Sequence, residues 1–297
     1  MTETVIVTGG RGRSGRWICD HLAGEYRVVC VDLDHPGWEI PERDSVTFRA
    51  VDVTDGGEVR DLFAEYDPDG VVHWAALPSP ERHAGSRVFE TNVGATYTVL
   101  DAAGRAGADI VWASSESAYG LAFAAETPLP AYLPIDESHP NAPEDPYGTS
   151  KVVGEEIAKM VARRDGVGVA SIRASWIQYP GEYNCRDVAE GDLSGGAGNC
   201  WSYVDVRDVA SIVATALAAD FSGHEAVHAA AADNYVGRPT AELVEEQWGR
   251  LPAECQLDGD QSALSTVKAD GLLDWKPEYG WRDAADEDVP EPNLLAE

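Results

Sequence analysis

Short apolar runs alternate with helical patterns through the first 173 residues of the chain. The runs are rich in β-branched residues, as fully buried strands are, and they cover 4–8, 27–31, 46–51, 70–74, 109–113 and 168–173. The segments between them place apolar residues three or four positions apart, which predicts helices, and the two longest cover 85–106 and 146–164. Strands that alternate with helices predict an α/β fold built on a doubly wound parallel sheet.

The pattern after residue 173 is less regular. It predicts three further elements, a helix, a strand and a helix, at 205–220, 225–230 and 240–250. We therefore expect a main domain over 1–173, onto which the helix 205–220 packs back, and a small C-terminal lobe made of 174–204 and 221–297. The tail from Asp286 is acidic and contains prolines, so we expect it to be mobile.

A glycine-rich turn joins the first strand to the first helix. Gly9, Gly12 and Gly15 stand three residues apart, a spacing that allows a tight turn, close approach of a pyrophosphate and close packing of the helix on the strand. The helix that follows offers free backbone N–H groups to phosphates. The pattern predicts a dinucleotide-binding Rossmann fold. Cofactor contacts are expected from the whole turn, namely Gly9, Arg11, Gly12, Arg13, Ser14 and Gly15.

Acidic residues after the next two strands bear on the choice of cofactor. Asp32 follows the second strand, where a carboxylate accepts hydrogen bonds from the adenosine ribose and repels a 2′-phosphate, which favours NAD. Arg11 and Arg13 leave NADP open, because an arginine in the turn can bind that phosphate; the alternative is that both are solvated. Asp52, beside Val53, follows the third strand and either meets the adenine amino group or caps the next helix.

Three further features lie beside the expected cofactor path. Ala75 and Ala76 follow the fourth strand, and their small side chains suit close passage of a cofactor. His73 lies within that strand, so we expect a buried, hydrogen-bonded histidine rather than a catalytic one. Asn92 lies inside a helix, where asparagine is mildly unfavourable, so we expect it to bind neighbouring backbone near the site.

A tyrosine and a lysine lie four residues apart at the start of the helix 146–164. Residues at this spacing share a helix face, and the ammonium of Lys151 would lower the pKa of the Tyr147 hydroxyl by favouring its phenolate. Such a phenolate is a base for an alcohol proton near neutral pH. The alternative is a surface pair on an amphipathic helix. Three serines end the fifth strand, at the edge where parallel sheets bind ligands, namely Ser114, Ser115 and Ser117.

These motifs occur in the order typical of the extended short-chain dehydrogenase/reductase family, also called NAD-dependent epimerase/dehydratases, which the chain resembles over nearly its whole length. Beyond the glycine turn and the two acids, the matching segments are His73-Trp74-Ala75-Ala76, Asn92-Val93-Gly94-Ala95-Thr96, Ser114-Ser115, Tyr119-Gly120 and Tyr147-Gly148-Thr149-Ser150-Lys151. Tyr203-Val204-Asp205-Val206-Arg207-Asp208-Val209-Ala210 and Leu272-Leu273-Asp274-Trp275-Lys276-Pro277 also resemble the family.

The resemblance implies a role for each residue of the catalytic motif. Tyr147 would be the base, Lys151 would lower its pKa and bind the cofactor ribose, and the hydroxyl of Ser115 would orient the substrate oxygen. Ser115 is chosen over the other two serines because it lies four residues before Tyr119. The resemblance also implies NAD as cofactor, with NADP as the alternative, and a homodimer formed through the two long helices.

The chain departs from the family pattern in its second half. The nucleotide-sugar enzymes usually continue with Arg-x-x-Asn-x-x-Gly-Pro, and here Trp176 replaces the asparagine and Tyr179 the glycine. Residues 182–200 are also a shorter stretch than such enzymes devote to the nucleotide. The chain resembles instead the shorter members that oxidise free sugars, such as uronate and aldose 1-dehydrogenases. We expect oxidation at C1 to a lactone; the alternatives are a nucleotide-sugar 4-epimerase or dehydratase with tightly bound NAD, and a non-catalytic NAD(P)-sensing regulator.

The residues expected around the substrate favour a small sugar. Trp176 and Tyr179 suit stacking on a sugar ring. Arg186 pairs either with the carboxylate of a uronate or with a neighbouring acid. Glu116 would repel a carboxylate and accept hydrogen bonds from neutral hydroxyls, which favours an aldose such as arabinose, xylose, galactose or glucose. Substrate contacts are therefore expected from Ser115, Glu116, Trp176, Tyr179 and Arg186.

The charge balance narrows the partners and the setting. The 297 residues include 52 acidic and 22 basic ones, giving a formal net charge of −30, and the acids stand singly between apolar residues. Repulsion on such a surface is screened in concentrated salt, so we expect a salt-rich cytosol, and neither nucleic acid nor anionic membrane as partner. Five scattered cysteines without a CxxC predict neither disulfides nor a metal site. The sequence has no recognisable signal peptide or membrane-spanning run, which predicts a cytoplasmic protein.

Overall fold

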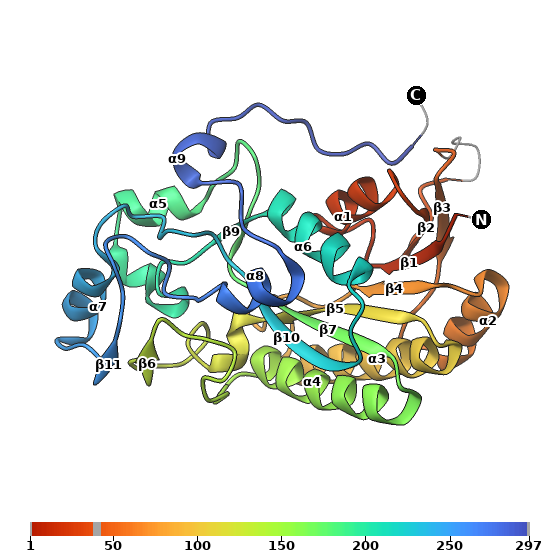
Figure 1. Cartoon of the computed structure of the whole chain (residues 1–297), viewed down its shortest axis with the longest axis horizontal. Helices are drawn as coiled ribbons and strands as arrows, with labels where there is room; N and C mark the ends of the chain where they lie inside the picture. The colour runs from red at the N-terminus through yellow and green to blue at the C-terminus, as the bar shows by residue number, and fades with distance from the viewer. Residues whose placement is uncertain (1, 38–42, 296–297) are drawn as a thin grey trace.

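The centre of the molecule is one sheet of seven parallel strands (Figure 1). The structure is a computed structural model that describes residues 2–37 and 43–295. In order across the sheet the strands are β10 (Gly223–Ala229), β7 (Gly168–Ala174), β5 (Asp109–Ser115), β4 (Gly70–His73), β1 (Thr4–Thr8), β2 (Arg27–Asp32) and β3 (Val46–Ala50). The doubly wound α/β fold predicted from the alternating pattern is confirmed.

Two helix layers cover the sheet, because side chains of each strand alternate between its faces. Val5 and Val7 of β1 pack into one core with helices α1 (Gly15–Leu22) and α6 (Val206–Ala218). Ile6 packs into the opposite core, which is covered by α2 (Gly56–Tyr66), α3 (Gly85–Ala106) and α4 (Pro146–Asp165). Figure 1 shows the two layers above and below the sheet. The strands are continuous apolar runs because both of their faces are buried.

The strand order reverses at β1, which lies between β2 and β4. In an open parallel sheet, connections that leave to opposite faces at such a point open a crevice at the carboxyl ends of the strands, and ligands bind there. The glycine turn directly follows β1. The fold therefore places this turn, and the ends of β4 and β5, at the expected ligand-binding edge.

A smaller lobe lies beyond the carboxyl ends of the strands, at the left of Figure 1. It has its own core, which includes the fully buried Trp201, Tyr203 and Tyr235. The short elements of the lobe and its connections are β6 (Tyr132–Leu133), β8 (Ile177–Gln178), α5 (Cys185–Glu190), the 3-10 helix η2 (Leu193–Asn199), β9 (Val204–Asp205), α7 (Thr240–Trp248), β11 (Glu254–Cys255), α8 (Val267–Leu273) and α9 (Trp281–Ala284). Among the described helices, none is long and apolar enough to cross a membrane.

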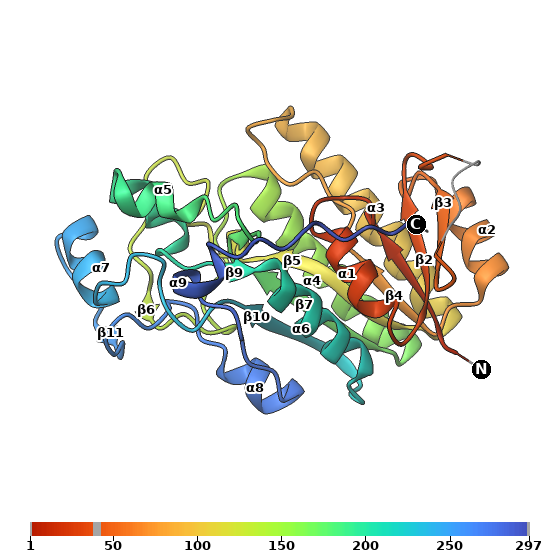
Figure 2. The same ribbon diagram turned by 90° about the horizontal axis from the view of Figure 1, so that it is seen from above.

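Two expectations about the second half differ from the structure. β10 falls within the segment 221–297 that was assigned to the lobe, yet it pairs with β7 and extends the main sheet. The tail expected to be mobile lies across α1 instead (Figure 2). There Glu291 forms an ion pair with Arg16, and Leu294 is buried in the core beside α1. One leucine and the arginine thus hold an acidic segment whose composition alone indicates mobility.

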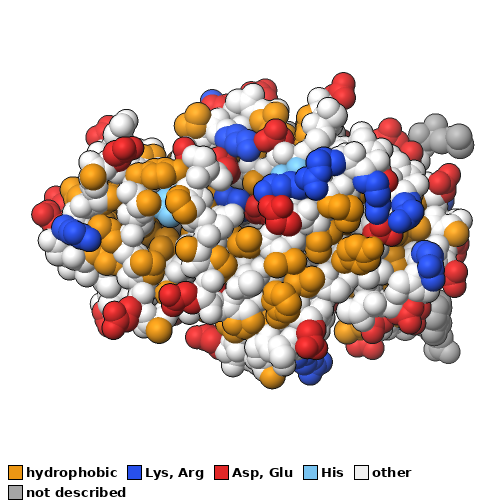
Figure 3. Space-filling view, turned by 90° about the horizontal axis from the view of Figure 1, so that it is seen from below, with side chains coloured by type: hydrophobic (Ala, Val, Ile, Leu, Met, Phe, Trp, Pro, Cys, Tyr) orange, Lys and Arg blue, Asp and Glu red, His pale blue; other side chains and the backbone are white. Residues whose placement is uncertain are grey.

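The face formed by α3 and α4 is partly apolar. Figure 3 views the molecule from this side and shows apolar side chains gathered near its centre. Tyr97 of α3 is 50% exposed. An apolar face of this kind suits burial against another surface, but the homodimer through these two helices stays a prediction.

We expect thermal stability to depend strongly on salt. The formal net charge of −30 creates repulsion, and exposed ion pairs each offset little of it. Salt screens repulsion between exposed charges, so the Tm should rise steeply between dilute and molar KCl. Thermal unfolding followed by circular dichroism measures this, and a Tm that stays flat over that range would rule out adaptation to salt.

Candidate active site

The three glycines of the turn serve different purposes. Gly9 has a φ of +69°, and a Cβ there would lie 2.7 Å from the backbone of Ala75; a Cβ on Gly15 would clash with the carbonyl of Gly9. Both are therefore required by the fold itself. A Cβ on Gly12 would meet only the Gly9 carbonyl, at 3.0 Å. The open space outside Gly12 fits close approach of a pyrophosphate to the first turn of α1.

Asp32 lies at the end of β2, beside the glycine turn. Its Oδ2 accepts a hydrogen bond from the Arg11 backbone N–H at 3.1 Å, which leaves further lone pairs for a ribose. The Arg11 guanidinium donates to the carbonyl oxygen of Asp34 at 2.7 Å. Arg13 pairs with Glu182. Both arginines of the turn thus have protein partners, and neither is simply solvated.

Asp52 was expected either to contact adenine or to cap the next helix, and the structure bears on the second role. Its carboxylate accepts hydrogen bonds from the backbone and hydroxyl of Thr54, at 2.9 and 2.7 Å. Helix α2 is capped by Asp55, whose carboxylate accepts from the backbone N–H of Gly57 and Glu58. The helix-cap interpretation of Asp52 is therefore wrong. Its contact with adenine, and that of the adjacent Val53, stay predictions.

The side chains around the end of β4 are held by hydrogen bonds. Asn92 accepts from the backbone N–H of Leu77 at 2.8 Å and donates to its carbonyl at 3.1 Å, so it fixes the backbone directly after Ala76. His73 is buried and bonded to Thr8. Burial lowers the pKa of His73 to about 3, which keeps the ring neutral. Both expectations for Asn92 and His73 are confirmed.

Helix α4 begins where its sequence dictates and brings the tyrosine to the serine. The carboxylate of Asp145 accepts hydrogen bonds from the backbone N–H of Tyr147 and Gly148, both at 2.8 Å, and caps the helix. A Cβ on Gly148 would lie 2.5 Å from the carbonyl of Ser117, in the 3-10 helix η1 (Glu116–Tyr119). Only glycine allows α4 to approach η1 this closely. Tyr147 consequently lies close enough to Ser115 for that hydroxyl to act on the pKa of Tyr147.

Burial, and not the lysine, controls the ionisation of the tyrosine. It raises the pKa of Tyr147 to about 12, and a hydrogen bond with Ser115 opposes the rise. Lys151 is 4% exposed, and its Nζ donates to the carbonyl of Ala113 at 2.6 Å and lies 5.2 Å from the centre of the Tyr147 ring. Burial lowers the pKa of Lys151 to about 7. In this structure the pKa of Tyr147 is raised and not lowered, so the net lowering expected from Lys151 is not found, and the surface-pair alternative is excluded because Lys151 is buried.

Glu116 lies buried beside Tyr147 and Ser115. One of its carboxylate oxygens accepts a hydrogen bond from the hydroxyl of Ser175 at 2.9 Å. Burial raises the pKa of Glu116 well above its usual range. Its ionised form would raise the pKa of Tyr147, Cys200 and Tyr235. Ser175 and Tyr235 were missed from the sequence. Ser175 follows β7 as Ser115 ends β5, which could have signalled it, whereas Tyr235 carries no local signal.

The remaining predicted substrate residues occupy three different places. Trp176 packs edge-on against Tyr235, with ring centres 6.0 Å apart. Tyr179 lies against the glycine turn, where the Arg13 guanidinium stacks on its ring at 3.8 Å. Arg186 lies at the surface and pairs with Asp286. The structure therefore groups Trp176 with Glu116 and removes Tyr179 and Arg186 from that group.

We expect the Glu116→Gln variant to change stability in a pH-dependent way. Because the folded-state pKa is raised, the native protein binds more protons than the unfolded chain above the usual glutamate pKa, and wild-type stability falls as pH rises through that window. Glutamine cannot ionise, so the variant's Tm should match wild type near pH 4 and exceed it increasingly toward pH 8. The exposed Glu156→Gln variant is the control, and a difference that does not vary with pH would contradict the assignment.

The sequence and the fold are similar to those of several known enzymes. L-arabinose 1-dehydrogenase (NAD(P)(+)) of Haloferax volcanii is 33% identical over 179 residues, which cover 58% of this chain and 66% of that protein. UDP-glucose 4-epimerase of Drosophila melanogaster is 33% identical over 180 residues, which cover 54% and 49%. The chain therefore matches about half to two thirds of the length of these relatives.

The solved structures agree over a longer span. The UDP-glucose 4-epimerase of Thermus thermophilus in complex with NAD has a TM-score of 0.67 and 25% identity, with 95% of this chain and 96% of that chain covered. The sequence profile of the NAD dependent epimerase/dehydratase family matches residues 5–230. That span contains the glycine turn, Asp32 and the Ser115–Tyr147–Lys151 group. By its sequence, fold and site, the chain belongs to the NAD-dependent epimerase/dehydratase family.

Proposed function

We propose that the protein oxidises a free aldose at C1 to a lactone, with NAD as the oxidant. The observation that carries this proposal is the chemistry of the substrate side of Tyr147, which is formed by the Glu116 carboxyl, the Ser175 hydroxyl, Trp176 and Tyr235. These groups suit the hydroxyls and the ring of a neutral sugar. A nucleotide diphosphate instead carries two negative charges, which need cationic or backbone N–H partners.

The segment that would hold a nucleotide offers little for those charges. Residues 174–200 contain a single basic residue, Arg186. Its guanidinium is paired with Asp286 at 2.7 Å and its side chain is 38% exposed. A carboxylate-bearing sugar loses its partner for the same reason, and the buried Glu116 offers it no positive charge. A neutral aldose is therefore preferred over a uronate.

Different residues of the chain bind the sugar, accept its proton and hold the cofactor. The hydroxyl of Ser115 binds the C1 oxygen of the sugar, and Tyr147 takes the proton from that oxygen as the C1–H bond breaks. The glycine turn, Asp32 and Lys151 hold the cofactor. NAD, when bound, accepts the hydride from C1, so the products are a lactone, NADH and one proton. Because the pKa of Tyr147 is raised to about 12, the rate of oxidation should rise with pH above neutrality.

We expect NAD to be preferred over NADP. The carboxylate of Asp32 accepts a hydrogen bond from the Arg11 backbone N–H at the end of β2, where the adenosine ribose would bind. This carboxylate would repel a 2′-phosphate. To bind that phosphate, the Arg11 side chain would have to leave the Asp34 carbonyl and Arg13 would have to leave Glu182. The kcat/KM should therefore be higher with NAD, and Asp32→Asn should narrow the gap. A higher kcat/KM with NADP for the wild type would overturn this preference.

A nucleotide-sugar 4-epimerase is the second candidate, because two UDP-glucose 4-epimerases and a putative third are also 30–34% identical to this chain over 176–183 residues. The same serine, tyrosine and lysine would serve that reaction. A non-catalytic sensor is disfavoured, because Ser115 and Lys151 are buried beside Tyr147 in a grouping that cofactor binding alone does not need.

One panel of assays separates these functions. Pentoses, hexoses and uronates are each incubated with NAD or NADP in molar KCl, and the absorbance of the reduced cofactor is followed. Net reduction with a neutral aldose supports the proposal. Silence with every free sugar, together with interconversion of UDP-glucose and UDP-galactose without net reduction, would establish the epimerase. Absence of reaction in both assays would favour the non-catalytic sensor.

A further inference from the structure

A row of buried polar side chains crosses three strands beside Ser115. Ser114 of β5 is in register with Arg173 of β7, which is in register with His228 of β10. Paired residues of neighbouring strands project to the same face of a sheet. Ser114, Arg173 and His228 are 4%, 3% and 0% exposed. Buried polar groups in such a position must be satisfied by each other or by a neighbouring element.

Glu155 of α4 satisfies one end of the row. Its Oε1 accepts hydrogen bonds from the Ser114 hydroxyl at 2.7 Å and from Arg173 Nε at 2.8 Å. Its Oε2 accepts from Arg173 Nη2 at 2.7 Å. Burial alone would raise the pKa of Glu155, but the hydrogen bonds and charge of Arg173 outweigh it and lower the pKa. The pair is therefore a buried, ionised, two-point contact.

The same arginine reaches the far end of η1. Arg173 Nη1 donates to the hydroxyl oxygen of Tyr119 at 2.8 Å. That oxygen lies 2.5 Å from His228 Nε2, and His228 Nδ1 lies 2.7 Å from the carbonyl of Ser265. A carbonyl only accepts, so Nδ1 carries the ring proton and Nε2 accepts from Tyr119. The hydrogen bonds thus run in one direction, from Arg173 through Tyr119 and His228 to Ser265.

Ser115 lies between the two anchored residues. Ser114 directly precedes it, and Tyr119 ends the short 3-10 helix that Ser115 caps. We propose that Glu155 and Arg173 are positioning residues, which hold the segment Ser115–Tyr119 at both ends and thereby fix the Ser115 hydroxyl against Tyr147. This inference rests on the proposed function only for its kinetic readout, since Ser115 and Tyr147 would act together in either sugar reaction.

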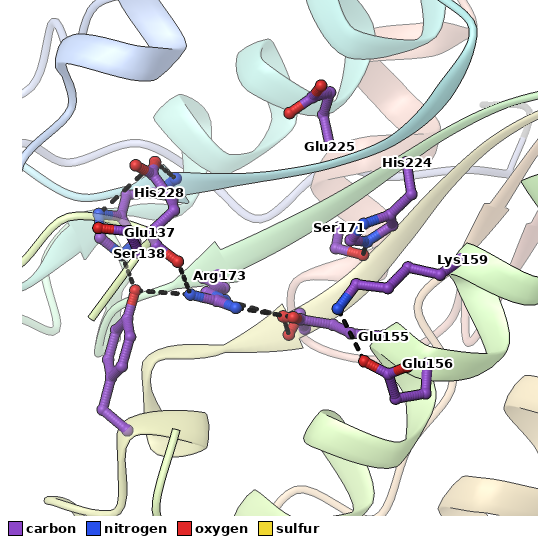
Figure 4. Close-up of polar contacts among 12 residues, drawn as sticks. Glu137, Ser138, Glu155, Glu156, Lys159, Ser171, Arg173, His224, Glu225 and His228 are labelled. Atoms are coloured by element: carbon purple, nitrogen blue, oxygen red, sulfur yellow. Dashed lines mark hydrogen bonds and ion pairs between the residues drawn. The ribbon is translucent and has the colours of Figure 1, made fainter. Parts of the chain in front are cut away.

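A cavity gives small solutes access to the pair. It has a volume of about 610 Å³ and lies between α4, β7, β10 and the start of α8, lined in part by Glu155, Arg173, Lys159, His224 and Lys268. Figure 4 shows the Glu155–Arg173 pair beside Lys159 and His224, with Glu156 turned to the outside of α4. Removal of the Glu155 side chain would therefore leave a cationic hole that a small carboxylate can enter from this cavity.

The test is chemical rescue of Glu155→Ala with sodium formate. At saturating sugar, kcat should fall about tenfold or more, whereas the Kd for NAD should change little, because the cofactor site is untouched. Formate should raise the kcat of Glu155→Ala at least threefold, because it replaces the missing carboxylate. The control is Glu156→Ala on the same helix, whose side chain is 66% exposed and pairs with Lys159; it should show neither the loss nor the rescue.

A second readout does not depend on turnover. In protein labelled with 13C at tyrosine Cζ, the Tyr147 resonance is assigned by its absence in Tyr147→Phe. Because the Ser115 hydroxyl acts to lower the pKa of Tyr147, Glu155→Ala should shift this resonance in the same direction as Ser115→Ala, and formate should move it back. If Glu155→Ala does not fold, Tyr119→Phe removes the other anchor with little change of volume and should shift the same resonance.

An unmoved Tyr147 resonance in these variants, or a wild-type kcat in folded Glu155→Ala without formate, would overturn the inference. Both results can be obtained whichever sugar the enzyme uses. They are therefore distinct from failure of the proposed function, which would show as wild-type silence with free aldoses while the Tyr147 resonance still responds to Glu155→Ala and formate.

Discussion

The Tyr147→Phe variant should lose about 10²- to 10⁴-fold in kcat, which is the usual contribution of a general base. The loss is expected because Tyr147 lies beside Ser115, whereas Lys151 Nζ is directed to the Ala113 carbonyl and the Glu116 carboxyl to the Ser175 hydroxyl. The aromatic ring would stay in place, since it packs edge-on against Phe123 with ring centres 5.9 Å apart. Steady-state kinetics with the best sugar of the panel measures the effect.

Two controls accompany that measurement. The Kd for NAD and the Tm should stay close to wild type, because the Asp145 cap of α4 involves only the backbone N–H of residue 147. Phe123→Leu, which removes the packing partner but no reacting group, should cost far less than Tyr147→Phe. A kcat for Tyr147→Phe within a few-fold of wild type would remove Tyr147 from the mechanism.

The Gly12→Val variant should fold but bind NAD at least about tenfold more weakly, a change of ~1.4 kcal/mol. An added Cβ on Gly12 meets only one carbonyl oxygen, at 3.0 Å, so the turn can form. The two methyl groups then occupy the space through which a pyrophosphate must approach the start of α1. NAD should consequently raise the Tm of wild type and leave that of the variant nearly unchanged.

A second glycine provides the matched control. Gly271 lies in α8, and a Cβ there would meet nothing within 4 Å. Gly271→Ala should keep the NAD affinity and gain stability of up to about 1 kcal/mol from helix propensity. Equal Tm shifts with NAD in wild type, Gly12→Val and Gly271→Ala would show that the cofactor does not pass over the glycine turn.

Much of the fold could be predicted because local sequence patterns indicate where each strand, turn and helix lies. Apolar runs such as 4–8 are continuous where both faces of a strand are buried. The glycine turn at 9–15 follows the first strand and indicates which edge of the sheet binds the ligand. The grouping of Ser115 with Tyr147 was also predictable, since the end of β5 and the start of α4 lie at one edge of the sheet.

The features that could not be predicted depend on burial and on contacts distant in sequence. Spacing shows that Lys151 and Tyr147 share a helix face, but only the packed structure shows that burial raises the tyrosine pKa. Arg186 meets Asp286 across 100 residues, and no local pattern reports such a pair. Tyr179 stacks against Arg13, which is also distant in the sequence, so local patterns do not report this contact either.

The most direct test of aldose oxidation at C1 uses a sugar that carries deuterium at that carbon. The best aldose of the panel is prepared as its C1-deuterated form and oxidised with NAD, and the reduced cofactor is analysed by mass spectrometry and NMR. We expect one deuterium per NADH and a lactone or its sugar acid as product, with the label lost from the sugar. Deuterium that stays on the sugar while NADH forms would contradict oxidation at C1, as would an epimerised sugar without net NADH.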